Sequence, residues 1–543
     1  MLNYVWLALI VLGIGAAVTT DIINKSENKY RNDLPLKSKI EFSSAFDSSA
    51  SKTYDVKIDI SKKAFNSFYN EKVDSSLVFP AKISFDKKNQ LNSLYFIVGS
   101  GGPKIWQDMA KVSGKDNDLT GTVKIDKIIS DTTALAQITF EEISFTKLKD
   151  ITSAVLDYAS TAVNISLGLI GIMALWLGVM KVAEEAGLIR IIANWLKPAT
   201  KKLFPDVPSD HPAMGSMIMN ISANILGLGN AATPFGLKAM EELDNLNPNK
   251  GTATNAMVTF LAINTAGMTL IPATAIAVRA AAGSSQPAII IGTSLFGSFC
   301  ATVAGITAAK VLEKFPIQKG GFGDWLSSNI KLLFFVLGIA VVLSLFLFTG
   351  VRSVVGSTLS FLNPNLFKNI IQFFSIIAIP LLIIVFISYG AYKKVKVYEE
   401  FVEGAKEGFN IAIKIIPYLV AMLMAIGIFR AGGAMDWLIY VLKPITHFIG
   451  MPAEALPMAL MRPLSGSGSL GIMTEILKVH GPDSLIGIMV STFYGSTETT
   501  FYVLAVYFGA VNIRNTRHAL PAGLIADVCG ILAAVFIVRM LFG

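Results

Sequence analysis

Charged residues are scarce in this chain of 543 residues: Asp, Glu, Lys and Arg make up 15% of it, whereas 53% of its residues are hydrophobic. A soluble protein carries about 25% charged residues, so the composition indicates a polytopic membrane protein whose first partner is the lipid bilayer. The net charge of +8 comes from scattered basic residues. We interpret them as loop anchors at an anionic membrane face and expect no nucleic-acid partner.

Cysteine and histidine are also rare. Cys300 and Cys529 lie far apart in apolar runs, no CxxC is present, and the four histidines show no ligand spacing. We therefore expect no disulfide framework, no metal site and no cofactor. Gly466-Ser467-Gly468 lacks the strand–turn–helix context of a hydrolase nucleophile. With no evident His–acid partner, we expect no catalytic residues and predict that the chain is not an enzyme.

The N-terminal region combines one apolar segment with one hydrophilic segment. Met1–Thr20 has no charged side chain, is long enough to span a bilayer and lacks the basic start of a signal peptide, so we expect an uncleaved transmembrane helix. Asp21–Asp150 is rich in Lys, Asp and Ser. We expect it to form an inserted, small β-rich soluble domain, because its alternation is too regular for a loose loop.

Several stretches of this segment carry the expected secondary structure. Strand period is visible in Tyr54–Ile60, Ala81–Phe85 and Thr122–Asp126. The short apolar run Leu94–Val98 predicts a strand buried on both faces. One helix is expected near Lys62–Lys72.

Beyond residue 150 the chain alternates between long apolar runs and amphipathic stretches. Spans are predicted at Tyr158–Met180, Thr252–Val278, Ala288–Ala309, Leu332–Gly350, Asn369–Tyr392, Ala412–Phe429, Ser484–Ile513 and Ala519–Val538. Amphipathic segments at the membrane interface are predicted at Val182–Pro198, Lys393–Asn410 and Met435–Ile449.

Two apolar stretches are interrupted by helix breakers and polar residues. Met214–Ala239 contains Gly227 and Pro234 among buried-type residues, and Leu456–Leu477 is similarly broken. In lipid, broken backbone survives only where protein or a wet cavity satisfies its free groups. We expect broken or re-entrant hairpins at a polar site. The alternative is a kinked structural helix packed through small residues.

The two halves of the membrane region resemble each other. Met219–Gly229 aligns without gaps to Met461–Gly471, and Asn264–Thr269 falls opposite Gly495–Thr500. Interrupted segments at corresponding positions of two halves point to transporter architecture. If the basic loops are cytoplasmic, the span count makes the two repeats inverted and places the inserted domain outside the cytoplasm.

Polar residues near these interruptions form the candidate site. Glu498 is the sharpest candidate, because an acid inside a membrane must be paired or face a cavity. We expect it to lie at the tip of a broken or re-entrant segment. Arg462 is its expected partner, although a purely structural ion pair is the alternative. Amide and hydroxyl groups of the other candidates suit a small polar solute, or else join helices by hydrogen bonds. The full candidate set is Asn224, Asn230, Asn264, Thr265, Thr269, Arg462, Ser465, Ser467, Ser496, Thr497, Glu498 and Thr500.

Long motifs resemble a known family. TNAMVTFLAINTAGMTLIP in the first half, and LPMALMRPLSGSGSLGIM and GSTETTFYVLAVYFGAV in the second, look like the spore maturation A and B family of nucleoside-recognition gate-domain proteins. The resemblance implies an A–B fusion that is a multi-pass protein of the bacterial inner (plasma) membrane. Related gate domains occur in nucleoside and ferrous-iron transporters. The cysteines expected near an iron path are absent from both broken hairpins, which argues against iron.

The sequence thus predicts five regions: a transmembrane helix at 1–20, the inserted domain at 21–150, an A-like gate domain at 151–320, a connecting span at 321–365 and a B-like gate domain at 366–543. Two functions stay open. The first is a transporter or permease for a small polar solute, with its site between the two broken hairpins. The second is a non-transporting membrane assembly factor in spore or envelope maturation. A homo-oligomer is compatible with either.

Overall fold

The computed structural model describes residues 2–46, 51–86, 91–99, 101–113, 118–313, 338 and 364–543. The chain divides into two compact units. One contains residues 7–157 and 427–437, and the other contains residues 1–6, 158–426 and 438–543. Apart from position 338, the predicted span Leu332–Gly350 lies outside the described residues.

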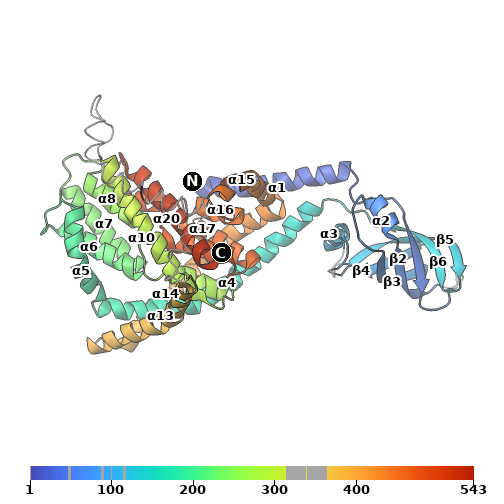
Figure 1. Cartoon of the computed structure of the whole chain (residues 1–543), viewed down its shortest axis with the longest axis horizontal. Helices are drawn as coiled ribbons and strands as arrows, with labels where there is room; N and C mark the ends of the chain where they lie inside the picture. The colour runs from blue at the N-terminus through green and yellow to red at the C-terminus, as the bar shows by residue number, and fades with distance from the viewer. Residues whose placement is uncertain are drawn as a thin grey trace, which may run out of the picture. The chain divides into compact units, whose positions relative to one another are not determined.

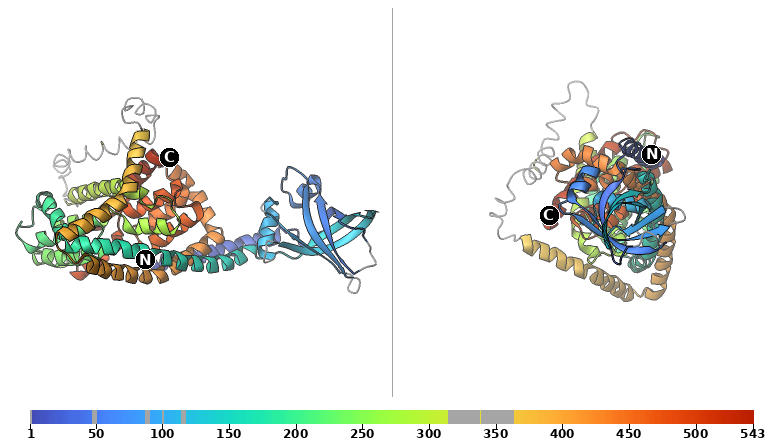
Figure 2. Two further views of the ribbon diagram at one scale, coloured as in Figure 1. Left: turned by 90° about the horizontal axis from the view of Figure 1, so that it is seen from below. Right: turned by 90° about the vertical axis from the view of Figure 1, so that its right-hand side faces the viewer.

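Six antiparallel strands form a closed barrel in the first unit (Figures 1 and 2). Each strand pairs with the next, and the last strand pairs back with the first. Closure leaves no unpaired edge on which another strand could add. The strands are β1 (Leu36–Phe42), β2 (Thr53–Ile60), β3 (Leu77–Asp86), β4 (Leu91–Ile97), β5 (Asp118–Ser130) and β6 (Thr133–Phe140), with helices α2 (Lys62–Tyr69) and α3 (Lys104–Ser113).

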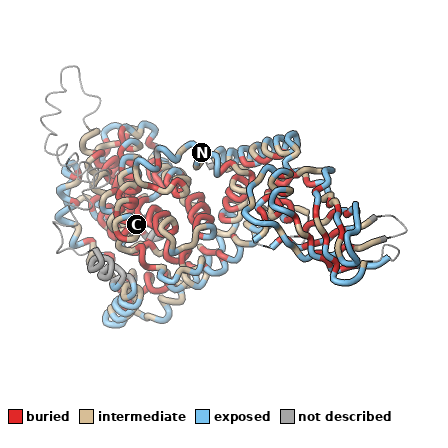
Figure 3. Tube along the Cα trace, turned by 45° about the vertical axis from the view of Figure 1, so that its right-hand side comes forward, coloured by how far each residue is buried: buried red, intermediate tan, exposed pale blue. Residues whose placement is uncertain are grey.

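The barrel confirms the predicted β-rich region and corrects one strand. Leu94 and Phe96 are each 2% exposed, whereas Tyr95 and Ile97 are 37% and 53% exposed. The strand is therefore buried on one face only, because a barrel wall has an inside and an outside (Figure 3). Trp106 of α3 fills part of the interior against Phe96.

A buried carboxylate ties together the two helices that flank the barrel in sequence. Asp21 lies in α1 (Leu2–Ser26) and is 3% exposed. It accepts hydrogen bonds from the backbone N–H groups of Lys147 (2.9 Å) and Leu148 (3.0 Å) in the first turn of α4 (Thr146–Glu185). An acid satisfies the free N–H groups at a helix start and favours the positive end of the helix dipole.

The second unit is helical. Within the described residues of the whole chain, five helices are long and apolar enough to cross a membrane: α1, α4, α10 together with the short turn before it, α14 and α20. This confirms a helical protein with several candidate membrane spans. The bounds of the other helices named below are as follows. They are α5 (Leu188–Leu203), α6 (Pro212–Leu226), α7 (Gly229–Asn245), α8 (Asn255–Ala266), α9 (Ala273–Ala281), α10 (Ile290–Leu312), α13 (Pro364–Tyr392), α14 (Val397–Ala431), α15 (Ala434–Phe448), α16 (Leu456–Met461), α17 (Gly466–His480), α18 (Leu485–Ser496), α19 (Thr500–Ala510) and α20 (Ala519–Phe542).

Two predicted boundaries between spans and amphipathic segments are wrong. The predicted amphipathic segment Lys393–Asn410 and the span Ala412–Phe429 lie largely on one continuous helix, α14. Likewise α4 continues past Met180 and ends only before Gly187, which has a φ of 82°. Hydropathy shows where the surface of a helix changes from apolar to amphipathic. The helix itself ends only at a residue that leaves the helical conformation.

Two of the predicted spans, Thr252–Val278 and Ser484–Ile513, are each divided into two helices. α8 and α9 are separated at Gly267–Pro272, where Gly267 has a φ of 57°. α18 and α19 are separated at Thr497–Thr499, where Thr497 is extended. The break in the second half was predicted around Glu498, whereas the break in the first half was not.

The two broken spans run in opposite directions. The segment before α8 lies beside the segment after α19, where Thr252 forms a β-bridge with Asn515. The last turn of α9 lies beside the segment before α18, where Arg279 pairs with Asp483 at 2.9 Å. Both α8 and α18 pack against α10 and α20, the last helices of the two halves, which also pack along each other (Figure 1).

The Arg279–Asp483 pair closes one end of this arrangement. Arg279 is fully buried and also donates to the carbonyl oxygens of Pro287 and Pro482. Burial alone would raise the pKa of Asp483, but hydrogen bonds from Ser284 and Ser285 and the charge of Arg279 hold that pKa below its ordinary value. The two loops are therefore joined by a charged cluster outside the spans.

Candidate functional site

The breaks of the two divided spans touch each other. The backbone N–H of Glu498 donates to the carbonyl oxygen of Thr265 at 2.8 Å. A Cβ added at Gly267 would lie 2.7 Å from Cγ of Glu498. Glycine is needed there both for its positive φ and for this close approach. The two polar clusters, around Thr265 in the first half and around Glu498 in the second, therefore meet through their backbones.

Arg462 holds the second break. It lies between α16 and α17, is 2% exposed, and donates from Nη2 to the carbonyl oxygens of Tyr494 (3.0 Å) and Thr497. Its Nη1 donates to Oγ1 of Thr499 at 3.3 Å. The end of α18 leaves carbonyl oxygens without partners in the helix, and a cation is the favoured partner at that end. The guanidinium therefore makes the break tolerable inside a membrane.

Glu498 faces outward from this tightly packed region into open space. Its side chain is 53% exposed, whereas Thr497 and Thr499 beside it are 2% and 4% exposed. Its Oε2 lies 3.6 Å from Nη2 of Arg462, so the expected ion pair is present. That distance is longer than a hydrogen bond. Within the described part of the chain, no other side chain forms an ion pair with Glu498.

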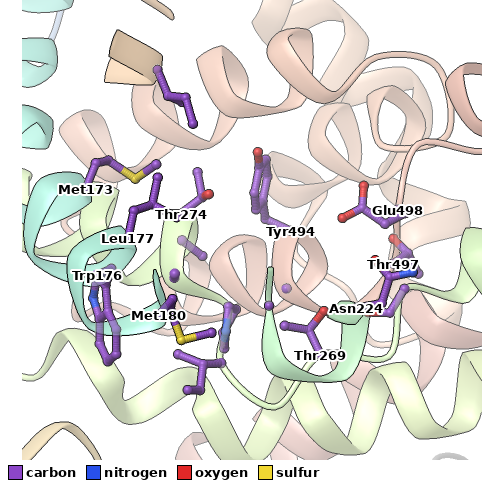
Figure 4. Close-up of a pocket in the computed structure, with 18 residues that line it drawn as sticks. Met173, Trp176, Leu177, Met180, Asn224, Thr269, Thr274, Tyr494, Thr497 and Glu498 are labelled. Atoms are coloured by element: carbon purple, nitrogen blue, oxygen red, sulfur yellow. Dashed lines mark hydrogen bonds between the residues drawn. The ribbon is translucent and has the colours of Figure 1, made fainter. Parts of the chain in front are cut away.

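The open space is a pocket of about 230 Å³ bounded by both breaks. Four of the predicted residues line it, namely Asn224, Thr269, Thr497 and Glu498. Figure 4 shows the polar groups at one end and apolar side chains of α4, including Trp176, at the other. Glu498 is the one acidic or basic side chain among the lining residues. The contribution of α4 was not predicted, because only tertiary packing brings this helix to the pocket.

A polar network lies behind the pocket in the first half. Asn224 donates to Oδ1 of Asn264 at 2.9 Å, and the hydroxyl of Tyr507 donates to the same oxygen at 3.3 Å. Asn220 in turn donates to the Tyr507 oxygen at 3.2 Å. We did not predict Asn220 or Tyr507. The ungapped repeat match pairs Asn220 with Arg462, and that equivalence was the available signal.

The other predicted residues whose side chains the structure describes do not line the pocket. Ser465 caps the start of α17 by accepting from the N–H of Gly468, and Ser467 lies 3.3 Å from it, oxygen to oxygen. Ser496 is buried and donates to the carbonyl oxygen of Thr492. Asn230 lies in the first turn of α7, but its side chain is outside the described part of the structure.

Thr265 and Thr500 lie nearby but also away from the lining. Both are fully buried, and both approach Gly523 of α20. Thr500 donates to Oδ2 of Asp527 at 2.5 Å. Among the residues that the structure describes, no group of three or more His, Cys, Asp or Glu side chains is placed to hold a metal ion.

Comparison with known families identifies the class of protein. The family model for nucleoside-recognition gate domains matches the chain twice, at residues 166–282 and 412–514. Each match contains one of the two broken spans, α8–α9 in the first and α18–α19 in the second. The chain is thus a gate-domain protein with two such domains.

Curated relatives place the chain more narrowly. Spore maturation protein B of Bacillus subtilis (strain 168) is 52% identical over 175 residues, which are 32% of this chain and 98% of that protein. Spore maturation protein A of the same organism is 48% identical over 159 residues, which are 29% of this chain and 81% of that protein. The chain belongs to the spore maturation A and B family, and its two matches are consistent with a fusion. No solved structure matches it.

Proposed function

We propose that the chain is a membrane permease for a small polar solute and that the solute binds in the pocket between the two helix breaks. The observation that carries the proposal is the meeting of two broken helices at a pocket containing a carboxylate. Half-helices that end inside a membrane present free backbone groups to a ligand at the site of transport. An ionisable side chain at such a place is a functional candidate by default.

The pocket favours a solute that is small and partly apolar. Its volume of about 230 Å³ lies below the range of about 300–1,000 Å³ that is common for drug-sized ligands. Asn224, Thr269 and Thr497 offer hydrogen bonds, and Glu498 offers a charged acceptor. Trp176 and the methionines of α4 offer apolar contacts. Asn264 orients Asn224 by a hydrogen bond, and Arg462 holds Thr497 and Glu498.

The architecture of the permease is proposed as an inverted repeat. Support comes from the opposite directions of the broken spans and from their matched contacts with α10 and α20. The break in α18–α19 agrees with the sequence match of Asn264–Thr269 to Gly495–Thr500. The breaks in the two hairpins do not fall at equivalent positions when Met219–Gly229 is aligned without gaps to Met461–Gly471. The first half breaks at Gly227, whereas the second breaks after Met461. We retain two re-entrant hairpins as part of the proposal.

The surroundings follow from the same proposal. We place the protein in the bacterial inner membrane, with the β-barrel outside the cytoplasm, and assign no enzymatic activity and no nucleic-acid partner. An exposed cysteine at Ser44 in a variant lacking Cys300 and Cys529 tests the side of the barrel. We expect an impermeant maleimide to label it in cells whose outer layers alone are opened. Labelling only after the inner membrane is permeabilised would contradict this placement.

The solute is found by a thermal-shift screen of the purified full chain against nucleosides, amino acids, amines and inorganic ions. We expect one class to stabilise the wild type but not Glu498→Gln, and proteoliposomes to take up that class only with the wild type. Equal stabilisation and uptake by Glu498→Gln would reject this site. Failure of every class in both assays would favour the alternative function.

That alternative is a membrane assembly factor acting through the barrel. The observation in its favour is an apolar outer face on the paired strands β3 and β4, where Val78 and Ile97 are 57% and 53% exposed. An assembly factor should lose its cellular role when Val78 and Ile97 are replaced by serine and keep it in Glu498→Gln. If the chain is a permease, Glu498→Gln should lose the cellular role and the serine variant at Val78 and Ile97 should keep it.

A further inference from the structure

Asp527 is a carboxylate that the pocket does not use. It lies within α20, one of the candidate spans, and is fully buried. Gly523, Asp527 and Gly530 share one face of this helix, because they are spaced four and three residues apart. Cβ atoms added at these glycines would lie 2.8 Å from Cγ2 of Thr500 and 2.7 Å from Cγ2 of Thr497. The face that carries Asp527 therefore packs directly on the break between α18 and α19.

The hydrogen bonds of this carboxylate are few. Oδ2 accepts the hydroxyl proton of Thr500 at 2.5 Å. Oδ1 is buried and has no hydrogen-bond partner among the described residues. An ionised carboxylate would have acceptor sites on both oxygens to satisfy, and a single hydroxyl does not satisfy them.

The surrounding charges do not replace the missing partners. The charged groups that act on Asp527 are Arg462 and Glu498. Arg462 donates to Tyr494, Thr497 and Thr499 and forms its ion pair with Glu498, and within the described residues no ion pair joins it to Asp527.

Among the residues that the structure describes, the helices packed against this region contribute no ion pair to Asp527 either. α8 presents Thr265, and α10 presents Ala301 against Gly530. Of the titratable groups on these helices, Cys300 of α10 lies near Cys529 of α20, Lys310 of α10 acts on His518 at the start of α20, and Tyr494 of α18 lies beside Arg462. Burial of an unpaired charge is so unfavourable that such a group takes up a proton instead.

We propose that Asp527 is a proton-binding site that is occupied in this conformation and is linked to the pocket through the α18–α19 break. Thr500, the first residue of α19, donates to Asp527, and Glu498, two residues earlier, lines the pocket. A movement of the break on solute binding would change the hydrogen bond that Thr500 gives to the Asp527 carboxylate and the distance from Asp527 to the charge of Glu498. The proton would then be released or taken up with the solute. This coupling role rests on the proposed permease function.

The protonation state can be measured without knowing the solute. Infrared difference spectra of the full chain in proteoliposomes, wild type minus Asp527→Asn, should show the C=O stretch of a protonated carboxylic acid near neutral pH. Subtraction is required because the chain has 38 Asp and Glu residues. Asp527→Asn keeps the size of the side chain and an acceptor for Thr500. A difference spectrum containing only carboxylate bands would overturn the proposal.

Two further variants test the link to the pocket while Asp527 stays in place. Thr500→Val removes the hydroxyl donor and should shift the frequency of the acid band. Glu498→Gln removes the pocket charge and should move the midpoint of the band's pH titration, whereas Asp483→Asn in a remote loop should leave that midpoint unchanged. An unmoved midpoint in Glu498→Gln would overturn the link. If the band behaves as expected but no solute is transported, the permease function fails and the proton site stands.

Discussion

Replacement of Arg462 by methionine should separate the structural part of the site from its functional part. The variant keeps most of the side-chain volume but removes the donors to two backbone carbonyl oxygens and one hydroxyl. Hydrogen bonds to a charged group contribute about 1.5–3 kcal/mol each, and an acceptor left buried without a partner costs about 1–3 kcal/mol. We therefore expect Arg462→Met to lower the free energy of unfolding by about 3–5 kcal/mol, as for other broken buried pairs.

Glu498→Gln should have a much smaller effect on stability. Its carboxylate is half exposed and lies 3.6 Å from Arg462, and such ion pairs contribute about 0–1 kcal/mol. Thr499→Ala serves as a matched control, because it removes one long hydrogen bond, worth about 0.5–1.5 kcal/mol. Unfolding of the full chain by SDS in mixed micelles, followed by circular dichroism, measures all three variants. Equal losses in Arg462→Met and Glu498→Gln would refute the structural role assigned to the arginine.

Three further perturbations follow from other parts of the structure. Gly267→Ala places a Cβ against Glu498 at a residue with positive φ. In addition to the backbone strain of alanine at positive φ, the close contact should lower the free energy of unfolding by about 1–3 kcal/mol. Gly283→Ala, also at positive φ but in open space, is its control, and equal unfolding midpoints would contradict the close contact. Tyr507→Phe removes one hydrogen bond from each of the Asn220 and Asn264 side chains, which keep their bonds to Ala232 and Asn224, and should cost about 0.5–1.5 kcal/mol per bond lost; an unchanged midpoint would reject the network. The folded pKa of Asp483 lies below its ordinary value of 3.8, so its stabilisation is present above that value and is lost as the pH falls through the folded pKa. Asp483→Asn should remove this acid-dependent step in thermal unfolding, and an identical pH profile would show that the pair contributes nothing.

The sequence predicted the features that depend on local pattern. Apolar runs marked the candidate spans, and alternation marked β2, β3 and β5, because a half-buried strand repeats every two residues. The ion pair of Glu498 with Arg462 was predictable, because an acid in an apolar run requires a partner.

Features that depend on distant contacts were not predictable. The run Leu94–Val98 does not show how many of its faces are covered, because coverage depends on barrel closure. The gap between α8 and α9 contains one glycine and one proline, which an apolar span also tolerates. The role of Trp176 and of the α4 face around it arises only when α4 packs beside the breaks. The sequence does not show that Asp527 lacks partners, because that depends on which side chains the helices around α20 bring to it.

The water accessibility of the pocket tests the central claim most directly. In a variant without Cys300 and Cys529, Thr274→Cys places a thiol in the pocket lining, whereas Thr293→Cys places one at a fully buried contact between α10 and α18. A small water-soluble maleimide in native membranes should label the cysteine at 274 and not the one at 293, and a solute from the screen should slow that labelling. Equal absence of labelling at both positions would mean a dry packed core, and the pocket could not be a binding site for a polar solute.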